Sequence, residues 1–165
     1  MLSRRVLPVA GFLAAAMLSA CGFQLRGQYT LPFSSVFVST SGGSVVAVEL
    51  KRELANIPTS VMSTAKDADA QLNIIEDRRD RQILSLSGAG RVREYDLKLK
   101  VVYQLIDAKG GVFIPTSEIQ LSRILSYDDS RIIAKQQEEA LLYQDMERDA
   151  VGQILRRMTA IKRPG

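Results

Sequence analysis

The sequence predicts an α+β domain, a small mixed and mainly antiparallel β-sheet of about four long strands with two α-helices packed on one face. Two observations carry this prediction. Apolar and polar residues alternate through residues 94–105, which is typical of a long strand with one buried face. Two other segments, which begin near Ser44 and near Asp128, place apolar residues at helical spacing. A chain of 165 residues fits one such domain.

Residues 1–20 predict a cleaved signal peptide. Two arginines precede an uncharged, mostly apolar stretch, which is shorter than the roughly 20 apolar residues that a membrane span needs. Residues 18–21, LSAC, resemble the bacterial lipobox. That resemblance implies that Cys21 carries a covalent N-acyl chain (palmitate) and an S-diacylglycerol lipid, and Gly22 is compatible with the outer membrane. The alternative is an ordinary signal peptide with a chance cysteine.

Composition excludes several classes of function. The full chain has 22 basic and 18 acidic residues, and loss of the signal peptide lowers the net charge from +4 to about +2, too little to predict a nucleic-acid partner. The sequence contains no histidine and one cysteine, which excludes His-based nucleophilic catalysis and His or Cys zinc sites. No glycine-rich phosphate loop is present. We therefore expect no enzyme activity, no metal and no cofactor apart from the lipid.

The first half of the domain predicts short strands around one helix. Residues 21–33 lack periodicity and predict a lipidated tether, which leaves residues 34–165 as the single domain. Residues 36–38 predict a short buried strand, and residues 60–64 a second one beside it. Between them, Ser44 is a plausible N-cap. The helical stripe that follows consists of Val46, Leu50, Leu54 and Ile57.

The middle of the chain predicts a meander of long antiparallel strands. Residues 72–75 and 83–86 are apolar and flank six consecutive charges at 76–81. A glycine-containing turn at 88–90 leads into the alternating strand, and a second turn at 109–111 leads into another strand that includes residues 118–122. The apolar face of the alternating strand consists of Tyr95, Leu97, Leu99, Val101, Tyr103 and Leu105.

The last element is predicted to be a long amphipathic helix that starts near residues 128–130. Acidic residues dominate its beginning and basic residues its end, an order that suits the helix dipole. Residues 134–139, AKQQEE, interrupt the apolar stripe, so we expect the first turns to project beyond the core. The stripe consists of Leu142, Met146, Ala150, Ile154, Met158 and Ile161.

Three segments resemble the LptE family of lipopolysaccharide-assembly lipoproteins. These are CGFQLRG after the lipobox, REYDLKLKV in the alternating strand, and RILSYDDSRIIAKQQEEALLYQDMERDAVGQILRRM through the last helix. The resemblance implies a small sheet with two helices on one face. It also implies an outer-membrane protein that plugs the β-barrel protein LptD, assists its assembly and, with it, inserts lipopolysaccharide into the outer leaflet.

The resemblance also implies basic residues that bind lipopolysaccharide. Lys135 stands where the family often has a lysine, whereas the basic residue expected near the 88–90 turn is absent, and Arg91 or Arg93 could replace it. Lys98 and Lys100 follow on the same strand, and cations of this kind suit lipid A phosphates. An alternative interpretation is a solvated strand face with lysines protecting a sheet edge.

Besides a lipoprotein enzyme, which the absence of histidine makes a poor candidate, two functions remain open at this stage. One is the plug of LptD, with lipopolysaccharide as ligand and the outer membrane as location. The other is an auxiliary lipoprotein subunit of another envelope lipid transporter. Copurified partners distinguish them, because a plug retains one large barrel protein and a transporter subunit retains inner-membrane proteins.

Overall fold

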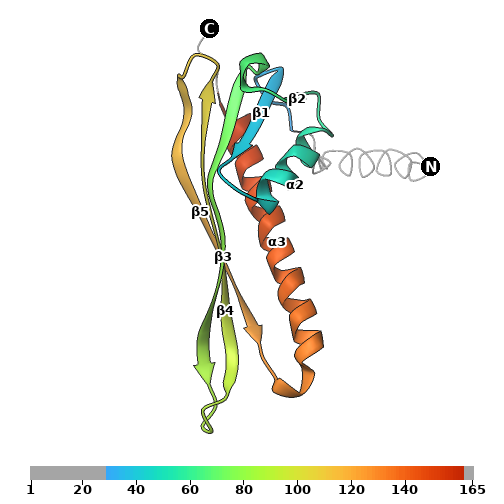
Figure 1. The fold of residues 1–165 in the computed structure, drawn as a ribbon, viewed down its shortest axis with the longest axis vertical. Helices are drawn as coiled ribbons and strands as arrows, with labels where there is room; N and C mark the ends of the chain where they lie inside the picture. Colours follow the sequence, from blue (N-terminus) through green and yellow to red (C-terminus); the bar gives the residue numbers. More distant parts are fainter. Residues whose placement is uncertain (1–28, 162–165) are drawn as a thin grey trace, which may run out of the picture.

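The computed structural model describes residues 29–161, so Cys21 and the predicted signal peptide lie outside the described residues. The elements are β1 (Ser35–Thr40), α2 (Val45–Leu54), β2 (Ser60–Met62), β3 (Ala70–Leu86), β4 (Val92–Asp107), β5 (Val112–Ser126) and α3 (Ile132–Thr159). Their arrangement is an elongated sheet alongside one long and one short helix (Figure 1). The predicted fold class is confirmed, although the strand count differs: three strands are long and two are short.

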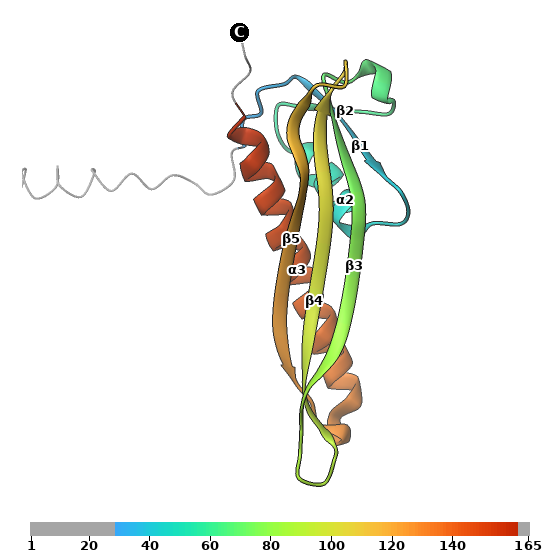
Figure 2. The ribbon, with the colours of Figure 1, turned by 90° about the vertical axis from the view of Figure 1, so that its left-hand side faces the viewer.

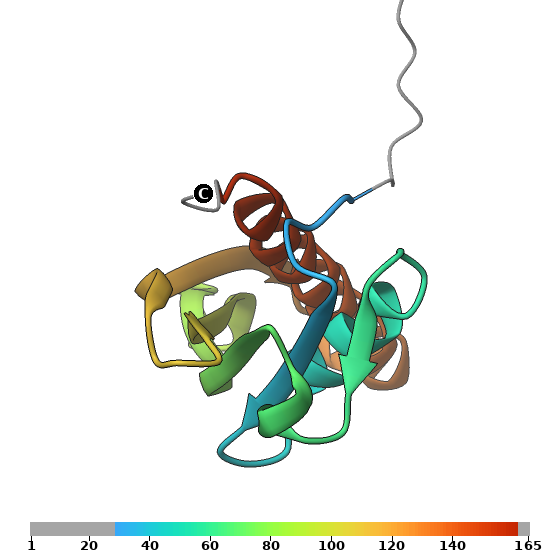
Figure 3. The same ribbon diagram turned by 90° about the horizontal axis from the view of Figure 1, so that it is seen from above.

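The five strands form one sheet in the order β2-β1-β3-β4-β5. The pairs β1–β2 and β1–β3 are parallel, and the long strands β3, β4 and β5 pair antiparallel, as the meander predicts. Viewed along the long axis, both helices lie on the same side of the curved sheet (Figure 3). The hairpin between β3 and β4 extends beyond the first turn of α3 (Figure 2).

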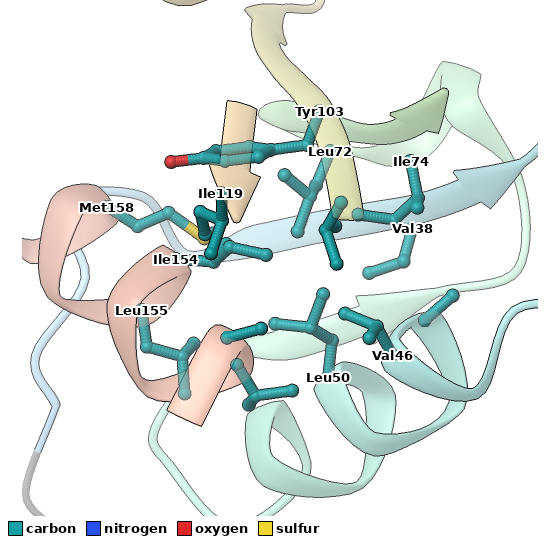
Figure 4. Packing of buried hydrophobic residues seen from close by; sticks show 14 of the residues in the cluster. Val38, Val46, Leu50, Leu72, Ile74, Tyr103, Ile119, Ile154, Leu155 and Met158 are labelled. Atoms are coloured by element: carbon teal, nitrogen blue, oxygen red, sulfur yellow. The ribbon is translucent and has the colours of Figure 1, made fainter. Parts of the chain in front are cut away.

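The core lies between the helices and the near face of the sheet. On β4, the predicted alternation is confirmed from Leu97 to Leu105, because every second side chain is buried, while Tyr95 is partly buried against the same core. Side chains from β3 and β4, such as Leu72 and Tyr103, meet Leu50 of α2 and Ile154 of α3 (Figure 4). Burial of this apolar surface is the main force that holds the two layers together.

Helix α2 begins at the residue that the sequence predicts. The Ser44 side chain accepts a hydrogen bond from the Ala47 backbone N–H at 2.9 Å. Asp77 of β3 accepts further bonds from Ser44 Oγ at 2.6 Å and from the Val46 N–H at 3.2 Å. A carboxylate at a helix N-terminus also complements the helix dipole. One charge of the 76–81 run is therefore used to fix α2 on the sheet.

β3 continues through the whole charged run. Its partner β1 pairs only with residues Ala70 to Ile74, so residues 75–86 form a free edge of the sheet. Register shifts occur at Ile75 and again around Leu84. Charged side chains and bulges are devices that keep a free edge from pairing with another strand. The six charges therefore mark an edge within one long strand.

The C-terminal end of the predicted tether packs on the domain. Phe33 is buried and its ring lies 6.2 Å from that of Phe113, while Tyr29 and Leu31 pack against the same core. Pro32 interrupts this short segment, which shows no regular period in the sequence. The packed part of the chain thus begins before residue 34.

Candidate functional site: basic residues on the open sheet face and at the hairpin end

Lys98 and Lys100 lie on the face of the sheet that points away from the helices. Lys100 Nζ is 2.8 Å from Glu76 and 3.7 Å from Glu118, on the two neighbouring strands. Lys98 Nζ donates to Gln82 at 2.8 Å and lies 3.4 Å from Asp96. The hydrogen bond between Lys100 and Glu76 raises the pKa of the lysine and lowers that of the carboxyl. These two lysines are thus already neutralised by local carboxylates.

An open depression of about 450 Å³ runs over this part of the sheet. Arg78, Asp80 and Lys98 line it together with the side chains of Gln120 and Ser122 from β5. Arg78 is itself 3.5 Å from Glu76, so both signs of charge alternate across the surface. The arrangement is a polar, hydrogen-bonding wall, and it suits a polar partner surface better than a single anion.

Arg91 and Arg93 lie at the hairpin end of β4, Arg91 just before the strand and Arg93 within it. The turn is closed by a backbone bond from the Ser87 N–H to the Arg91 carbonyl at 2.7 Å, and Gly90 adopts φ of +75°, which favours glycine. Both arginines are exposed, and no carboxylate within residues 29–161 forms an ion pair with either. Their charges are therefore available to a ligand.

The structure divides the three basic residues of β4 into two groups. Lys98 and Lys100 lie on the open face of the sheet, whereas Arg93 lies nearer the hairpin, at a register shift between β3 and β4. These residues are close in the sequence but do not form a single basic cluster.

Lys135 lies in the first turn of α3, at the same end of the molecule as the hairpin (Figure 2). Its Nζ is 2.8 Å from Glu138 of the same helix. The predicted projection of this part of α3 is confirmed, because the buried residues of the helix begin at Tyr143. Lys135 thus shares an end of the protein with Arg91 and Arg93, and the two lysines of the open face do not.

The other arginines of β3 have a structural role that the sequence did not reveal. Arg79 donates to Glu147 at 2.8 Å, and Arg81 donates to Glu139 at 3.0 Å, both across to α3. The guanidinium of Arg81 also lies over the Tyr95 ring at 4.7 Å, and its pKa is raised, chiefly by the hydrogen bond to Glu139. Every second residue of a strand faces the same side. The spacing of Arg79 and Arg81, two residues apart in the charged run, could therefore have predicted that both face a helix.

Residues 29–161 contain no group of acidic, histidine or cysteine side chains that could hold a metal ion. Within the same range, no helix has the length and apolar character to cross a membrane. Two depressions of the surface are lined by charges of both signs, and another is lined mainly by apolar residues.

Comparison with solved structures shows which class of protein has this fold. The chain is similar to lipoprotein B from Nitrosomonas europaea, with 40% identity and a TM-score of 0.73 over 84% of this chain and 91% of that one. It is similar to rare lipoprotein B from Shewanella oneidensis, with 26% identity and a TM-score of 0.64 over 76% and 94% of the two chains. The class is that of small α+β bacterial lipoproteins.

The family follows from a second comparison. The model of the LptE lipopolysaccharide-assembly family matches residues 33–158, and the chain belongs to this family. A search of curated proteins finds no significant match. LptE proteins are lipopolysaccharide-assembly lipoproteins that are not enzymes and need no cofactor, as the composition predicts. The family match begins at Phe33, which is the first buried residue of the range 29–161.

Proposed function

We propose that the protein lies in the lumen of the β-barrel protein LptD, assists its assembly and, with it, inserts lipopolysaccharide into the outer leaflet of the outer membrane. The observation that carries the proposal is the match to the LptE family over residues 33–158. The match spans the sheet and nearly all of α3, and it therefore includes the hairpin and Lys135.

The surface of the domain is suited to a barrel interior. The lumen of an outer-membrane barrel is polar, so a plug needs charged and hydrogen-bonding contacts. The open sheet face provides them, since Lys98 and Lys100 alternate with carboxylates and with Gln82. In this proposal, the two lysines serve mainly to contact the barrel wall.

Lipopolysaccharide binding is proposed at the hairpin end. Arg91 and Arg93 are exposed and have no carboxylate partner within the described residues, and Lys135 lies at the same end. Arginine can bind a phosphate through two hydrogen bonds, so these residues suit the lipid A phosphates. Lys98 and Lys100 are weaker candidates for this role because they lie on the open sheet face, away from the two unpaired arginines, and carboxylates pair with them. Lys135 also has a carboxylate partner, Glu138, but it lies at the same end as the arginines.

The proposed anchor is Cys21, which lies outside the described residues. Three acyl chains on one residue exceed the two signals needed for stable membrane attachment. We expect intact-mass analysis of protein from membranes to show a chain that begins at Cys21 with an N-acyl and an S-diacylglycerol group. An unmodified Cys21, or another first residue, contradicts the anchor while leaving the plug proposal in place.

Copurification tests the function itself. Protein with a C-terminal tag, extracted from the native envelope in mild detergent, should retain one large barrel protein, identified by mass spectrometry as LptD. Recovery of inner-membrane transport proteins, with no barrel protein, would instead indicate an auxiliary subunit of another envelope lipid transporter.

A further inference from the structure

Three exposed aliphatic side chains lie near the tip of β3. Ile83 is 59% exposed, Leu84 50% and Leu86 55%. They follow the charged run on the free edge of the sheet, where β1 no longer pairs with β3. Single exposed aliphatic residues are common on protein surfaces, but here three lie within four residues at one strand tip, where the register of β3 against β4 shifts.

The hairpin register places these side chains beside the two unpaired arginines. Leu86 pairs with Val92, and Ile83 pairs with Tyr95, so Arg91 and Arg93 lie on the adjoining strand within the same stretch. The nearest carboxylate on that strand, Glu94, accepts a hydrogen bond from Ser85 Oγ at 2.6 Å. Residues 83–93, here called the hairpin arm, thus combine apolar side chains with positive charge.

This combination indicates the chemistry of the partner. A polar barrel wall would satisfy the arginines and would leave the aliphatic side chains without an apolar partner. An anionic lipid satisfies both, because its phosphates bind guanidinium groups and its acyl chains cover aliphatic side chains. The arm also projects beyond the first turn of α3, so a large lipid can approach it (Figure 2).

We propose that Ile83, Leu84 and Leu86 contact the acyl chains of lipopolysaccharide while Arg91 and Arg93 bind its phosphates. This inference rests on the proposed function, in which lipopolysaccharide is the ligand. It adds an acyl-chain site on β3 and predicts that recognition depends on acylation as well as on charge.

The test compares binding of lipopolysaccharide, fully deacylated lipopolysaccharide and phospholipid vesicles of phosphatidylethanolamine and phosphatidylglycerol. The arm variant carries Ile83→Ser, Leu84→Ser and Leu86→Ser. The matched control carries Val48→Ser, Val112→Ser and Leu141→Ser, which change three similarly exposed aliphatic residues elsewhere on the surface. Circular dichroism and thermal melting establish that each variant is folded.

We expect the wild type to bind lipopolysaccharide at least about tenfold more tightly than the deacylated form, because each buried methylene contributes. The arm variant should bind both forms at the weaker, deacylated level, and the control should bind like the wild type. A folded arm variant with wild-type affinity for lipopolysaccharide overturns the inference. So does equal binding of both forms by the wild type.

Two further outcomes concern the identity of the ligand. Vesicle binding as tight as lipopolysaccharide binding, lost in the arm variant, assigns the arm to the bilayer and overturns the inference. Failure of the wild type to bind either form of lipopolysaccharide overturns the proposed ligand itself, and this result is distinct from failure of the acyl-chain site alone.

Discussion

Arg79 on β3 and Glu147 on α3 form an ion pair across the interface between sheet and helix. Arg79 Nε donates to Glu147 Oε1 at 2.8 Å, and the Glu147 side chain is only 4% exposed, compared with 43% for Arg79. The Arg79 guanidinium also lies 5.1 Å from the centre of the Tyr143 ring. With Arg81–Glu139 and Arg123–Asp149, this pair fastens α3 to the strands on either side of it.

Removal of Arg79 should destabilise the domain. Arg79→Ala leaves the Glu147 carboxylate buried without its partner, and we expect a loss of about 2 kcal/mol in the free energy of unfolding, below the usual range for buried pairs because Arg79 is partly exposed. The matched control is Arg78→Ala, which removes an exposed cation from the opposite face and should cost about 0.5 kcal/mol or less. Equal urea midpoints for the two variants contradict the structural role of the pair.

The two faces of β4 should differ in their tolerance of charge. Leu99 is buried, so Leu99→Asp places a carboxylate in the core and should cost several kcal/mol, of the order that unfolds the domain. Lys100 lies on the open face, and Lys100→Asp should cost about 1 kcal/mol through repulsion from neighbouring carboxylates. Thermal melting compares the two variants, and we expect a much lower melting temperature for Leu99→Asp. Equal melting temperatures would contradict the assignment of Leu99 to the buried face of β4 and of Lys100 to the open face.

Much of the fold could be predicted from the sequence where one face of an element is buried and the other is wet. The alternation on β4 and the stripe of α3 are examples, since burial imposes a period on the residues. The continuity of β3 could not be predicted in this way. Its charges occupy both faces, and the near-face charges are satisfied by α2 and α3, which are remote in sequence.

The candidate site was predictable only in part. Lys135 and the projecting turns of α3 follow from the interrupted apolar stripe. The sequence places Arg93, Lys98 and Lys100 on one strand, but the structure is needed to show that the two lysines lie beside carboxylates on the open face and that Arg93 lies near the hairpin. Whether a surface lysine has a carboxylate partner depends on strand register, which the sequence of one strand does not contain.

The pKa of Glu76 offers a test of the open sheet face. The hydrogen bond from Lys100 lowers this pKa, so the pair stabilises the fold above the ordinary pKa of glutamate and loses that contribution as the pH falls through the lowered value. An NMR titration should find the Glu76 midpoint below its ordinary range, and Lys100→Ala should move it upward. An unchanged midpoint in the variant shows that Lys100 does not act on Glu76.

Reversal of charge at the hairpin end should weaken lipopolysaccharide binding. We expect Arg91→Glu, Arg93→Glu and Lys135→Glu together to reduce affinity by about tenfold or more without unfolding the protein, since both arginines are exposed and Lys135 lies in the first turn of α3, before its buried residues begin. The control reverses Lys66, Lys109 and Arg156, which lie on other parts of the surface. If the folded triple variant still binds lipopolysaccharide, the proposed binding site at the hairpin end is wrong, whereas the proposed plug role is unaffected. Lys98 and Lys100 are then the next residues to test.

Site-specific photo-cross-linking in the native bacterium tests the central claim most directly. A cross-linking residue placed at Arg91 or Lys135 should capture LptD or lipopolysaccharide, because both positions lie at the end that we assign to the partner. The same residue at Leu142, which packs against the core, should capture neither. Normal protein levels with no adduct to LptD or lipopolysaccharide from position 91 or 135, or adducts only to inner-membrane proteins, contradict the account.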